Sequence, residues 1–472
     1  MSLDDKNLFR RTRLSALQNV FPELFDEGVP DMARLIEELS LLDEGTSESP
    51  CLHWAGKAQA KSQVHAPAHG RLVPDSNSVS TLNETEHVLI EGDNLEVLKA
   101  LKSTHFEQIK LMYIDPPYNT GKGFIYNDSF DAKSTASDKK KDSNSTWLSF
   151  IYPRLMAAKR LLALDGVIFV SIDDNSFGHL KIVMDEIFGA DNCITTFVWR
   201  RSGAGGLRGK FPVTIHEYVL CYSKDKSKHE QRWYAPYSKD SVAAFAHQDE
   251  RGRYKTQALY LSTLKSGENQ RYPIRLPNGT AALPPDGGVW RFIESTFHQK
   301  RMAGEILFRK TPNSPLLLET GHQSAFNIYT KQYMDIKGSN PPSMLPDDLV
   351  GQTRSAKSEI KKIFNAPVFD YPKPVSLIKY LIGLVPFEDD DICMDFFAGS
   401  GTTLHAVVEL NQSNSKRLRS ISVQSADPIP QSHVAYQEGF RVISEITAAR
   451  FNSVLSGASG FSKWKYIQSD GS

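Results

Sequence analysis

The spacing of apolar residues changes several times along the chain, and each change marks a different kind of segment. Residues from about 8 to 42 carry apolar side chains such as Leu17 and Phe21 at helical spacing, which predicts helices. Residues 44–86 are rich in Ser, Ala, His and Asn and hold few large apolar side chains, a composition typical of a linker. We therefore expect an N-terminal helical segment over residues 1–43, followed by a polar linker.

From residue 87 onward, short apolar runs alternate with amphipathic helices. The runs HVLIEGD (87–93) and IKLMYID (109–115) predict buried strands that each end in an acidic residue. The same alternation returns near the C-terminus, where DICMDFF predicts a strand and TTLHAVVEL the helix that follows it. Such an alternation is typical of a parallel sheet covered on both faces. We therefore expect one doubly wound α/β domain, divided between residues 87–198 and 367–472.

Residues 199–366 interrupt the alternation with short β-like pieces among many Gly, Pro and basic residues. The economical interpretation is an insertion into the α/β domain. Basic side chains on glycine-rich loops suit phosphate contacts, and arginine reads guanine edges. A solvated surface carries the same residue types, so that alternative stays open. The candidate DNA-binding residues surround the glycine-rich segment SGAGGLRGK and are Arg200, Arg201, Arg208 and Lys210.

The whole chain carries 55 Lys and Arg against 55 Asp and Glu, so its formal net charge is zero. Bulk electrostatics therefore offers no attraction for nucleic acid, and any DNA-binding surface must be a local basic patch. The four cysteines form no CxxC pair, which argues against a zinc site and fits a reducing cytoplasm. The sequence shows neither a signal peptide nor an apolar run that could span a bilayer. We expect a cytoplasmic protein that uses no metal.

The first loop that could carry chemistry is Asp115-Pro116-Pro117-Tyr118, which follows a predicted buried strand. Ligands bind beyond the carboxyl ends of the strands in open α/β sheets. The two prolines fix a rigid turn and leave a carbonyl aimed outward, while Asp115 supplies a carboxylate and Tyr118 an aromatic face. This set suits an exocyclic amine on a flat ring, because two acceptors hold the amine's hydrogens while the tyrosine stacks on the ring. A plain surface turn is the alternative.

The second loop is DFFAGSGTT (395–403), between a predicted strand and a helix. Gly399 and Gly401 allow a tight turn and let a ligand come close to the backbone. A Walker loop would need a lysine before the Ser/Thr pair, and a dinucleotide fingerprint would need a third glycine. The loop has neither, which leaves a nucleotide-like ligand without a large phosphate cluster. S-adenosylmethionine is such a ligand.

Together the two loops resemble those of the amino-methyltransferases of DNA, in which DPPY is the catalytic loop and FxGxG the cofactor loop. The catalytic loop comes first and the insertion separates the two, an order similar to that of the β class. Residues 85–455 further resemble the modification subunit of Type III restriction–modification systems, through runs such as IEGDNLEVLKAL, HEYVLCYSK and FDYPKPVSLIKYLI. The resemblance implies a Rossmann-like methyltransferase sheet with an inserted target-recognition domain.

The resemblance also implies roles for the matching residues. Asp115 and the carbonyl of Pro116 would hold the N6 amine of adenine, with Pro117 shaping the turn and Tyr118 stacking on the extruded base. Gln424 stands where many relatives have a ribose-binding acid, so either it or Asp427 could take that task. The residues that would bind S-adenosylmethionine are Asp93, Lys373, Pro374, Asp395, Phe397, Gly399, Gly401 and Thr402.

Several alternatives accompany these roles. Asp93 could be only a helix cap, and the Lys-Pro pair at 373–374, expected at the methionine end of the cofactor, could be only a helix start. Cytosine N4 methylation is a rival activity, although Asp rather than Ser at the head of the catalytic loop favours adenine. A DNA-binding specificity subunit without catalysis is another. A covalent route would need a cysteine after proline, and Cys51 lies upstream of the catalytic domain, so we interpret it as a surface residue.

The resemblance finally implies partners. Double-stranded DNA would be the substrate, a homodimer is expected, and a separate restriction (Res) subunit would supply cleavage. The sequence itself contains neither a Walker loop nor a cluster of nuclease carboxylates. We therefore expect that this chain alone does not cleave DNA.

Overall fold

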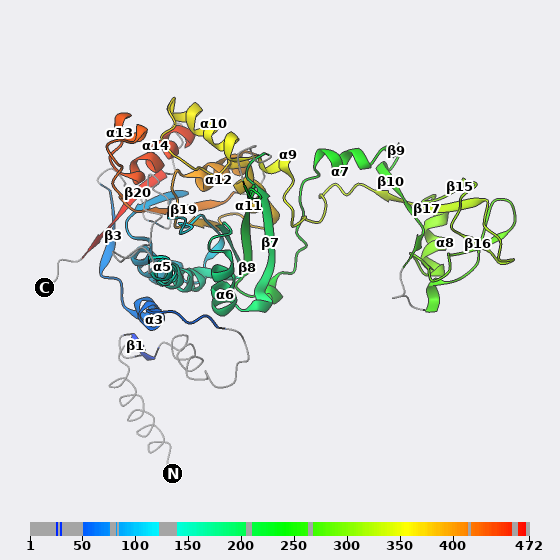
Figure 1. Cartoon of the computed structure of the whole chain (residues 1–472), viewed down its shortest axis with the longest axis horizontal. Helices are drawn as coiled ribbons and strands as arrows, with labels where there is room; N and C mark the ends of the chain where they lie inside the picture. The colour runs from blue at the N-terminus through cyan, green and yellow to red at the C-terminus, as the bar shows by residue number, and fades with distance from the viewer. Residues whose placement is uncertain are drawn as a thin grey trace, which may run out of the picture. The chain divides into compact units, whose positions relative to one another are not determined.

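The computed structural model describes residues 25–26, 29–30, 51–75, 82, 85–121, 139–203, 210–262, 268–413, 417–455 and 461–468. These residues divide into two compact units (Figure 1), which we treat separately. Unit 1 runs to Trp233 and resumes at Pro341, whereas unit 2 spans Tyr234–Asn340. The described helices include none that is both long and apolar enough to cross a membrane.

Unit 1 is built on a nine-stranded sheet with a parallel centre. Six neighbouring strands from β20 to β6 run parallel, while β3 at one edge and β8 and β7 at the other pair antiparallel. In spatial order the strands are β3 (Gly70–Pro74), β20 (Phe461–Gln468), β4 (His87–Glu91), β19 (Arg419–Gln424), β18 (Ile392–Asp395), β5 (Ile109–Ile114), β6 (Leu162–Ile172), β8 (His216–Ser223) and β7 (Cys193–Arg200).

Helices cover both faces of this sheet (Figure 1). One layer consists of helices that pack against one another in the order α3 (Lys57–His65), α5 (Lys139–Leu161) and α6 (Phe177–Phe188), with α4 (Asn94–His105) also against α5. The other layer contains α11 (Val375–Leu384), α12 (Thr402–Ser413) and α14 (Ile443–Leu455). Alternate residues of β4 face the two layers, because Val88 and Ile90 join one apolar cluster and Leu89 another. The expected doubly wound α/β class is confirmed.

The region expected to be a polar linker is partly folded. Within residues 44–86, α3 packs against α5 and buries Ala60 and Val64, and β3 pairs with β20 at the edge of the sheet. An edge strand and a short helix need only a few apolar contacts, so their sparse apolar pattern does not stand out from a linker. Of the expected N-terminal helices, only 25–26 and 29–30 are described, as two short paired strands; the rest lies outside the described residues.

The inserted unit is shorter than the expected 199–366. β7 and β8 continue the sheet of unit 1, because β8 pairs with both β6 and β7. Most side chains of β8 are buried. The helices α9 (Asp347–Val350) and α10 (Thr353–Phe364) likewise belong to unit 1. Only Tyr234–Asn340 form a compact unit of their own.

Unit 2 contains a four-stranded antiparallel sheet with an apolar cluster on one face. Its strands are ordered β15 (Ile306–Lys310), β17 (Phe326–Tyr333), β10 (Gly252–Ala258) and β9 (His247–Asp249). The cluster joins Ile306 and Ile328 of this sheet to the helix α8 (Glu294–Met302) and to Trp290, whose indole nitrogen donates to the Tyr272 carbonyl at 2.7 Å. The apolar cluster gives this unit a core of its own.

Burial of the central strands predicts a specific loss of stability. Ile421 on β19 is 2% exposed, whereas Ile467 on β20 is 51% exposed. We expect Ile421→Ala to lower the free energy of unfolding of unit 1 by about 2–5 kcal/mol, because apolar contacts are lost and a cavity remains. Ile467→Ala, the matched control, is expected to change it by less than about 0.5 kcal/mol. Urea unfolding followed by circular dichroism measures both, and equal losses would contradict the central position of β19.

Candidate functional site

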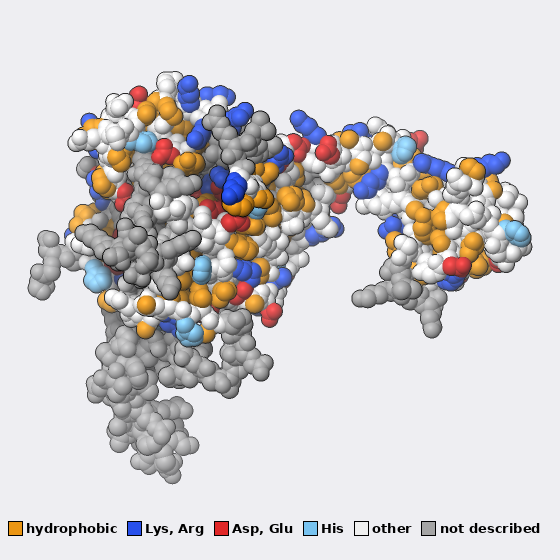
Figure 2. Space-filling view, in the orientation of Figure 1, with side chains coloured by type: hydrophobic (Ala, Val, Ile, Leu, Met, Phe, Trp, Pro, Cys, Tyr) orange, Lys and Arg blue, Asp and Glu red, His pale blue; other side chains and the backbone are white. Residues whose placement is uncertain are grey.

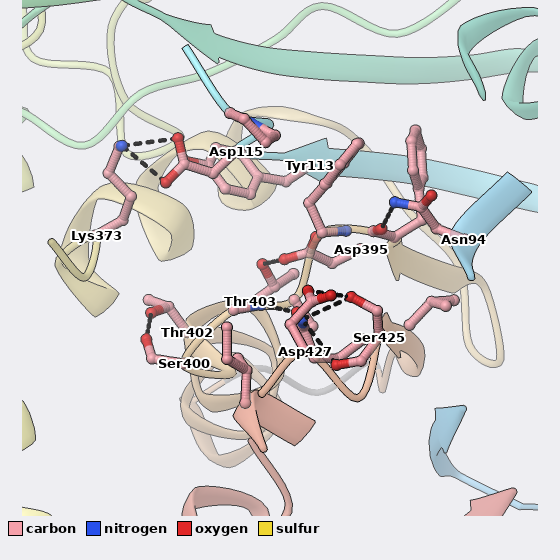
Figure 3. A pocket seen from close by; sticks show the side chains of 18 of the residues that line it. Asn94, Tyr113, Asp115, Lys373, Asp395, Ser400, Thr402, Thr403, Ser425 and Asp427 are labelled. Atoms are coloured by element: carbon pink, nitrogen blue, oxygen red, sulfur yellow. Dashed lines mark hydrogen bonds and ion pairs between the residues drawn. The ribbon is translucent and has the colours of Figure 1, made fainter. Parts of the chain in front are cut away.

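A cavity of about 390 Å³ opens at the edge of the sheet where four parallel strands end. The strands β4, β19, β18 and β5 are neighbours, so the segments that follow them surround one space. Both predicted loops line this cavity, together with Lys373 and the residues just before it. Figure 3 shows Asp115, Asp395 and Lys373 around this space. Two segments far apart in the sequence therefore meet at the position where open α/β sheets bind ligands.

The Asp115 carboxylate lies in a closed cluster of polar groups. Lys373 Nζ is 2.8 Å from both Asp115 oxygens, and the Tyr118 hydroxyl donates to Oδ1 at 2.6 Å. The same ammonium is 2.8 Å from the Tyr118 hydroxyl and 3.3 Å from Oε2 of Glu217 on β8. We call Asp115, Tyr118, Glu217 and Lys373 the acid–lysine cluster.

Burial and charge perturb the groups of this cluster. Burial disfavours the charged form of Lys373, but the carboxylates of Asp115 and Glu217 outweigh burial and raise its pKa. Burial, followed by the same two negative charges, raises the pKa of Tyr118 well above its ordinary value. At neutral pH Lys373 is therefore an ammonium, and Tyr118 is a neutral phenol that can donate a hydrogen bond.

The predicted site residues do not all lie in the cavity wall. The lining residues include Asp115, Pro117, Asp93, Lys373, Asp395, Phe397, Gly399 and Thr402. The other four predicted catalytic and cofactor-binding residues belong to the same segments but do not line the cavity. They are Pro116, Tyr118, Gly401 and Pro374. Lys373, expected at the methionine end of the cofactor, directs its ammonium at Asp115 (Figure 3).

The glycine loop has a fixed shape. Gly399 has a φ of 52° and Gly401 a φ of 79°, values that favour glycine. The Gly399 N–H donates to Oε1 of Gln424 at 2.7 Å, and its carbonyl accepts from the Thr447 hydroxyl at 2.6 Å. A Cβ at Gly401 would lie 2.8 Å from Cε1 of Phe451. The loop is therefore held on both sides, and it passes too close to α14 for a side chain at this position.

Asp395 anchors the beginning of the glycine loop. It ends β18 and is only 3% exposed, and its carboxylate accepts from the Phe397 N–H and the Thr403 hydroxyl. Burial raises the pKa of Asp395 to about 7, although these hydrogen bonds act in the opposite direction. The contacts tie the strand end to the first turn of α12.

Asp93 both caps a helix and lines the cavity. One carboxylate oxygen accepts from two backbone N–H groups in the first turn of α4, and the other pairs with Arg154 at 3.0 Å. The next residue, Asn94, donates to the Phe396 carbonyl at 2.8 Å. The helix-cap interpretation is therefore correct in geometry, and the same segment also braces the glycine loop.

The two candidates at the end of β19, Gln424 and Asp427, have different partners. Gln424 uses its amide oxygen on Gly399 and donates through Nε2 to the Ser425 carbonyl at 3.2 Å. The Ser425 hydroxyl donates to Asp427. All three residues line the cavity, and Figure 3 shows Ser425 beside Asp427. Asp427 is therefore the carboxylate on this side of the cavity.

Three charged side chains of the site were not expected from the sequence. Glu217 completes the acid–lysine cluster, Arg154 pairs with Asp93, and Arg450 on α14 donates to the carbonyl of Ser400 behind the glycine loop. Each is buried, and the stretches FIYPRLMAA and AARF around Arg154 and Arg450 are mostly apolar. Charged residues are almost never buried unless they are paired, and that is the signal by which they could have been found.

Two of the four candidate DNA-binding residues lie close to acids of unit 1. Arg200 pairs with Asp347 at 2.8 Å, and Arg201 Nε lies 3.6 Å from Glu217, so both belong to unit 1. Lys210 is exposed, and Arg208 lies outside the described residues. Within the described part of the chain, no three His, Cys, Asp or Glu side chains gather as a metal site would require.

Comparison of the sequence with known proteins matches most of the chain to one family. A family model described as DNA methylase matches residues 109–426. The Mod subunit of the Type III restriction-modification enzyme StyLTI of Salmonella typhimurium is 31% identical over 478 residues, which cover 93% of this chain and 70% of that protein. The Type II methyltransferase M.KpnI of Klebsiella pneumoniae is 34% identical and covers 83% of this chain and 93% of that protein.

The chain therefore belongs to the DNA methylase family, and its resemblance to Type III modification subunits is confirmed. Among solved structures, a putative DNA modification methylase from Thermus thermophilus, in complex with S-adenosyl-L-methionine, aligns with 80% of this chain and 99% of that chain. The two share 15% identity with a TM-score of 0.38.

The close approach at Gly401 predicts a loss of cofactor binding. We expect Gly401→Ala to weaken binding of S-adenosylmethionine at least tenfold, about 1.4 kcal/mol, because the new Cβ meets Phe451 and the left-handed φ is unfavourable. Gly383→Ala is the matched control, since Gly383 is an exposed residue of α11 with open space around it. Titration calorimetry measures both affinities, and unchanged binding in the Gly401 variant would show that the loop does not hold the cofactor.

Proposed function

We propose that this chain is a site-specific DNA methyltransferase that transfers the methyl group of S-adenosylmethionine to the N6 amine of adenine. It would act as the modification subunit of a Type III restriction–modification system. The observation that carries the proposal is the single cavity in which Asp115 of the DPPY loop faces the glycine loop. Membership of the DNA methylase family and 31% identity to a Type III Mod subunit support it.

The cavity residues fit this cofactor, which supplies a methyl group on a sulfonium cation. Phe397 and Phe150, with ring centroids 6.0 Å apart, offer an apolar wall. Asp93 is an acceptor for the amine of the cofactor's adenine. Asp427 is the acceptor for the ribose hydroxyls, because Gln424 already uses its amide oxygen to hold Gly399.

The DPPY loop would prepare the amine for direct in-line displacement. Asp115 and the Pro116 carbonyl accept the hydrogens of N6, which leaves the nitrogen lone pair directed at the methyl carbon. A new N–C bond would form as the S–C bond breaks, with the bonding pair left on the sulfur of the departing S-adenosylhomocysteine, and the methylated amine would then pass a proton to water. Correct placement of the two reacting atoms is worth about 7–11 kcal/mol in favourable cases. The target base must leave the duplex at a cost of a few kcal/mol, which stacking on Tyr118 offsets.

Unit 2 is the proposed target-recognition domain. Its residues include 14 Lys and Arg against 9 Asp and Glu, an excess of positive charge that the chain as a whole lacks. Figure 2 shows Lys and Arg side chains along the upper margin of this unit. A basic surface of this kind supplies the phosphate contacts on which DNA affinity depends.

One face of the four-stranded sheet in unit 2 combines aromatic and basic side chains. Tyr254 and Tyr333 are paired across β10 and β17 with ring centroids 5.5 Å apart, and Arg251 lies 4.7 Å from the Tyr333 ring. Arg309 on β15 lies 5.0 Å from the Tyr329 ring. Aromatic rings with interleaved cations are typical of nucleic-acid surfaces.

The proposed partners follow from the relatives. A homodimer and a Res subunit are part of the proposal, since three of the relatives at 30–32% identity are Mod subunits of Type III enzymes. A cytoplasmic location is also part of it, supported by four cysteines that are all free thiols.

Sequencing of modified DNA tests the proposal directly. The chain is expressed in a host that lacks DNA methylation, and single-molecule sequencing identifies the modified base and its context. N6-methyladenine at one fixed sequence is the expected result. N4-methylcytosine would overturn the choice of base, and specific DNA binding without any modified base would indicate a specificity subunit without catalysis.

Removal of the catalytic carboxylate predicts a loss of rate without loss of cofactor. We expect Asp115→Ala to slow methylation by about 10²–10³-fold, as for other preorganised polar groups, with S-adenosylmethionine affinity within about twofold. Asp165→Ala is the matched control, because Asp165 lies near the amino end of β6 and pairs with Lys110. Single-turnover assays and calorimetry give both quantities, and full activity of the Asp115 variant would refute its assigned role.

The basic face of unit 2 predicts a change in salt dependence. We expect Arg309→Gln to weaken DNA binding and to reduce the slope of log affinity against log salt concentration by about one, because one phosphate contact is lost. Cofactor binding, which belongs to unit 1, is expected to stay unchanged. Fluorescence anisotropy at several salt concentrations measures the slope, and an unaltered slope would remove Arg309 from the DNA-binding surface.

A further inference from the structure

Glu217 belongs to the acid–lysine cluster, but the contacts proposed for the base and for the cofactor do not involve it. Its side chain is 11% exposed, its Oε2 is 3.3 Å from Lys373 Nζ and 3.3 Å from the Tyr118 hydroxyl, and Arg201 Nε is 3.6 Å from its Oε1. Glu217 lies on β8, near one edge of the sheet, whereas Asp115 follows the central strand β5. Lys373 is therefore shared by carboxylates that come from two different strands.

Two buried carboxylates that approach one another repel unless a cation lies between them. Without the cation, the two carboxylates would push one another apart. Asp395, at the same sheet edge, shows the effect of burial on an acid whose hydrogen-bond donors are the neutral Thr403 hydroxyl and Phe397 N–H. Burial raises the pKa of Asp395 to about 7. Asp115, by contrast, is paired with the Lys373 ammonium.

We infer that Lys373 and Glu217 are positioning residues for Asp115. The Lys373 ammonium pairs with the Asp115 carboxylate and holds it aimed into the cavity, and Glu217 holds the ammonium from its other side. This inference rests on the proposed function and assigns Lys373 to the base side of the site rather than to the cofactor side.

The Asp115 carboxylate can still accept a hydrogen bond from the substrate. A carboxylate offers about four lone-pair positions. Lys373 occupies one on each oxygen, and the Tyr118 hydroxyl occupies one more on Oδ1. About one position on Oδ2 therefore remains for the N6 amine, while the Pro116 carbonyl is the second acceptor. The ammonium does not have to leave Asp115 when the base arrives.

Other charged or titratable groups also face the cluster. Tyr113 on β5 and Asp395 on β18 lie on the cavity side, and Arg201 lies beside Glu217. Of the groups around Lys373, only the two carboxylates are in ion-pair contact with it in the described structure. Because they outweigh burial and raise the pKa of Lys373, loss of Glu217 is expected to lower it.

Four variants test the inference on the duplex that sequencing identifies, at saturating cofactor. We expect Lys373→Gln to slow single-turnover methylation by about 10²-fold and Glu217→Gln by about tenfold, within the range for preorganised polar groups. S-adenosylmethionine affinity is expected to stay within about twofold in both. Lys373→Arg keeps the charge and is expected to recover about tenfold over Lys373→Gln. Lys379→Gln, on α11 and paired with Glu409, is the matched control with parental rates.

The pH profile separates positioning from a general effect on folding. Lys373 loses its charge as pH rises through its pKa, so the alkaline decline in rate is expected to begin at a lower pH in Glu217→Gln than in the parent. Parental melting temperatures would confirm that the variants are folded.

Two results would overturn the inference while leaving the proposed function intact. One is an active parent whose rate and pH profile are unchanged in Lys373→Gln and Glu217→Gln. The other is cofactor affinity weakened more than tenfold with parental rates at saturation, which would place Lys373 on the cofactor. A parent that binds the duplex and modifies no adenine would instead overturn the proposed function.

Discussion

The parallel pairing of β5 with β18 is the constraint on which the site depends. Cys393 is paired with Leu111 and Met394 with Met112, so both strands reach the same edge of the sheet together. Asp115, directly after β5, and Asp395, the last residue of β18, therefore line one cavity. Most of the chain between the two strands can vary in length, because the entropy of closing a loop grows only slowly with its length.

The cavity contains more acids than bases, and each acid is stabilised differently. Arg154 neutralises Asp93, Lys373 neutralises Asp115, and Asp395 has neutral hydrogen-bond donors and a raised pKa. Asp427 has a serine hydroxyl as its donor. A site that is acidic in balance favours a cationic ligand over a phosphate. This agrees with a sulfonium cofactor and with a glycine loop that lacks the lysine of phosphate-binding loops.

The sequence predicts the strands and helices whose own residues form a clear apolar pattern. β4, β5 and β18 are continuous apolar runs, because strands buried on both faces need no polar positions. β20 was missed, since FSKWKYIQ alternates with charged residues like an exposed segment although it lies between β3 and β4. The residues of β8 (HEYVLCYS) predict a β-like piece, but the surrounding glycine-rich and basic residues assign it to the insertion rather than to the main sheet. Composition averaged over a region is a weak guide where a strand borders an insertion.

The sequence predicts the two loops of the site, but it predicts few of the contacts between its charged side chains. Each of the two loops is one continuous stretch of sequence, so its residues and their chemistry can be recognised without knowledge of the fold. The partner of Asp115 is 258 residues away, and Glu217 lies on a third segment. Such pairs depend on strand order, which no local pattern encodes.

The formal net charge of zero conceals an uneven distribution of charge between the two units. Unit 2 holds 14 basic and 9 acidic residues, so the remaining residues hold 41 and 46 of the chain's totals. The two opposite imbalances cancel in the sum. A polyanion is attracted to the first and a cationic cofactor to the second, so one chain can attract both substrates of the proposed reaction because its charge is divided between its units.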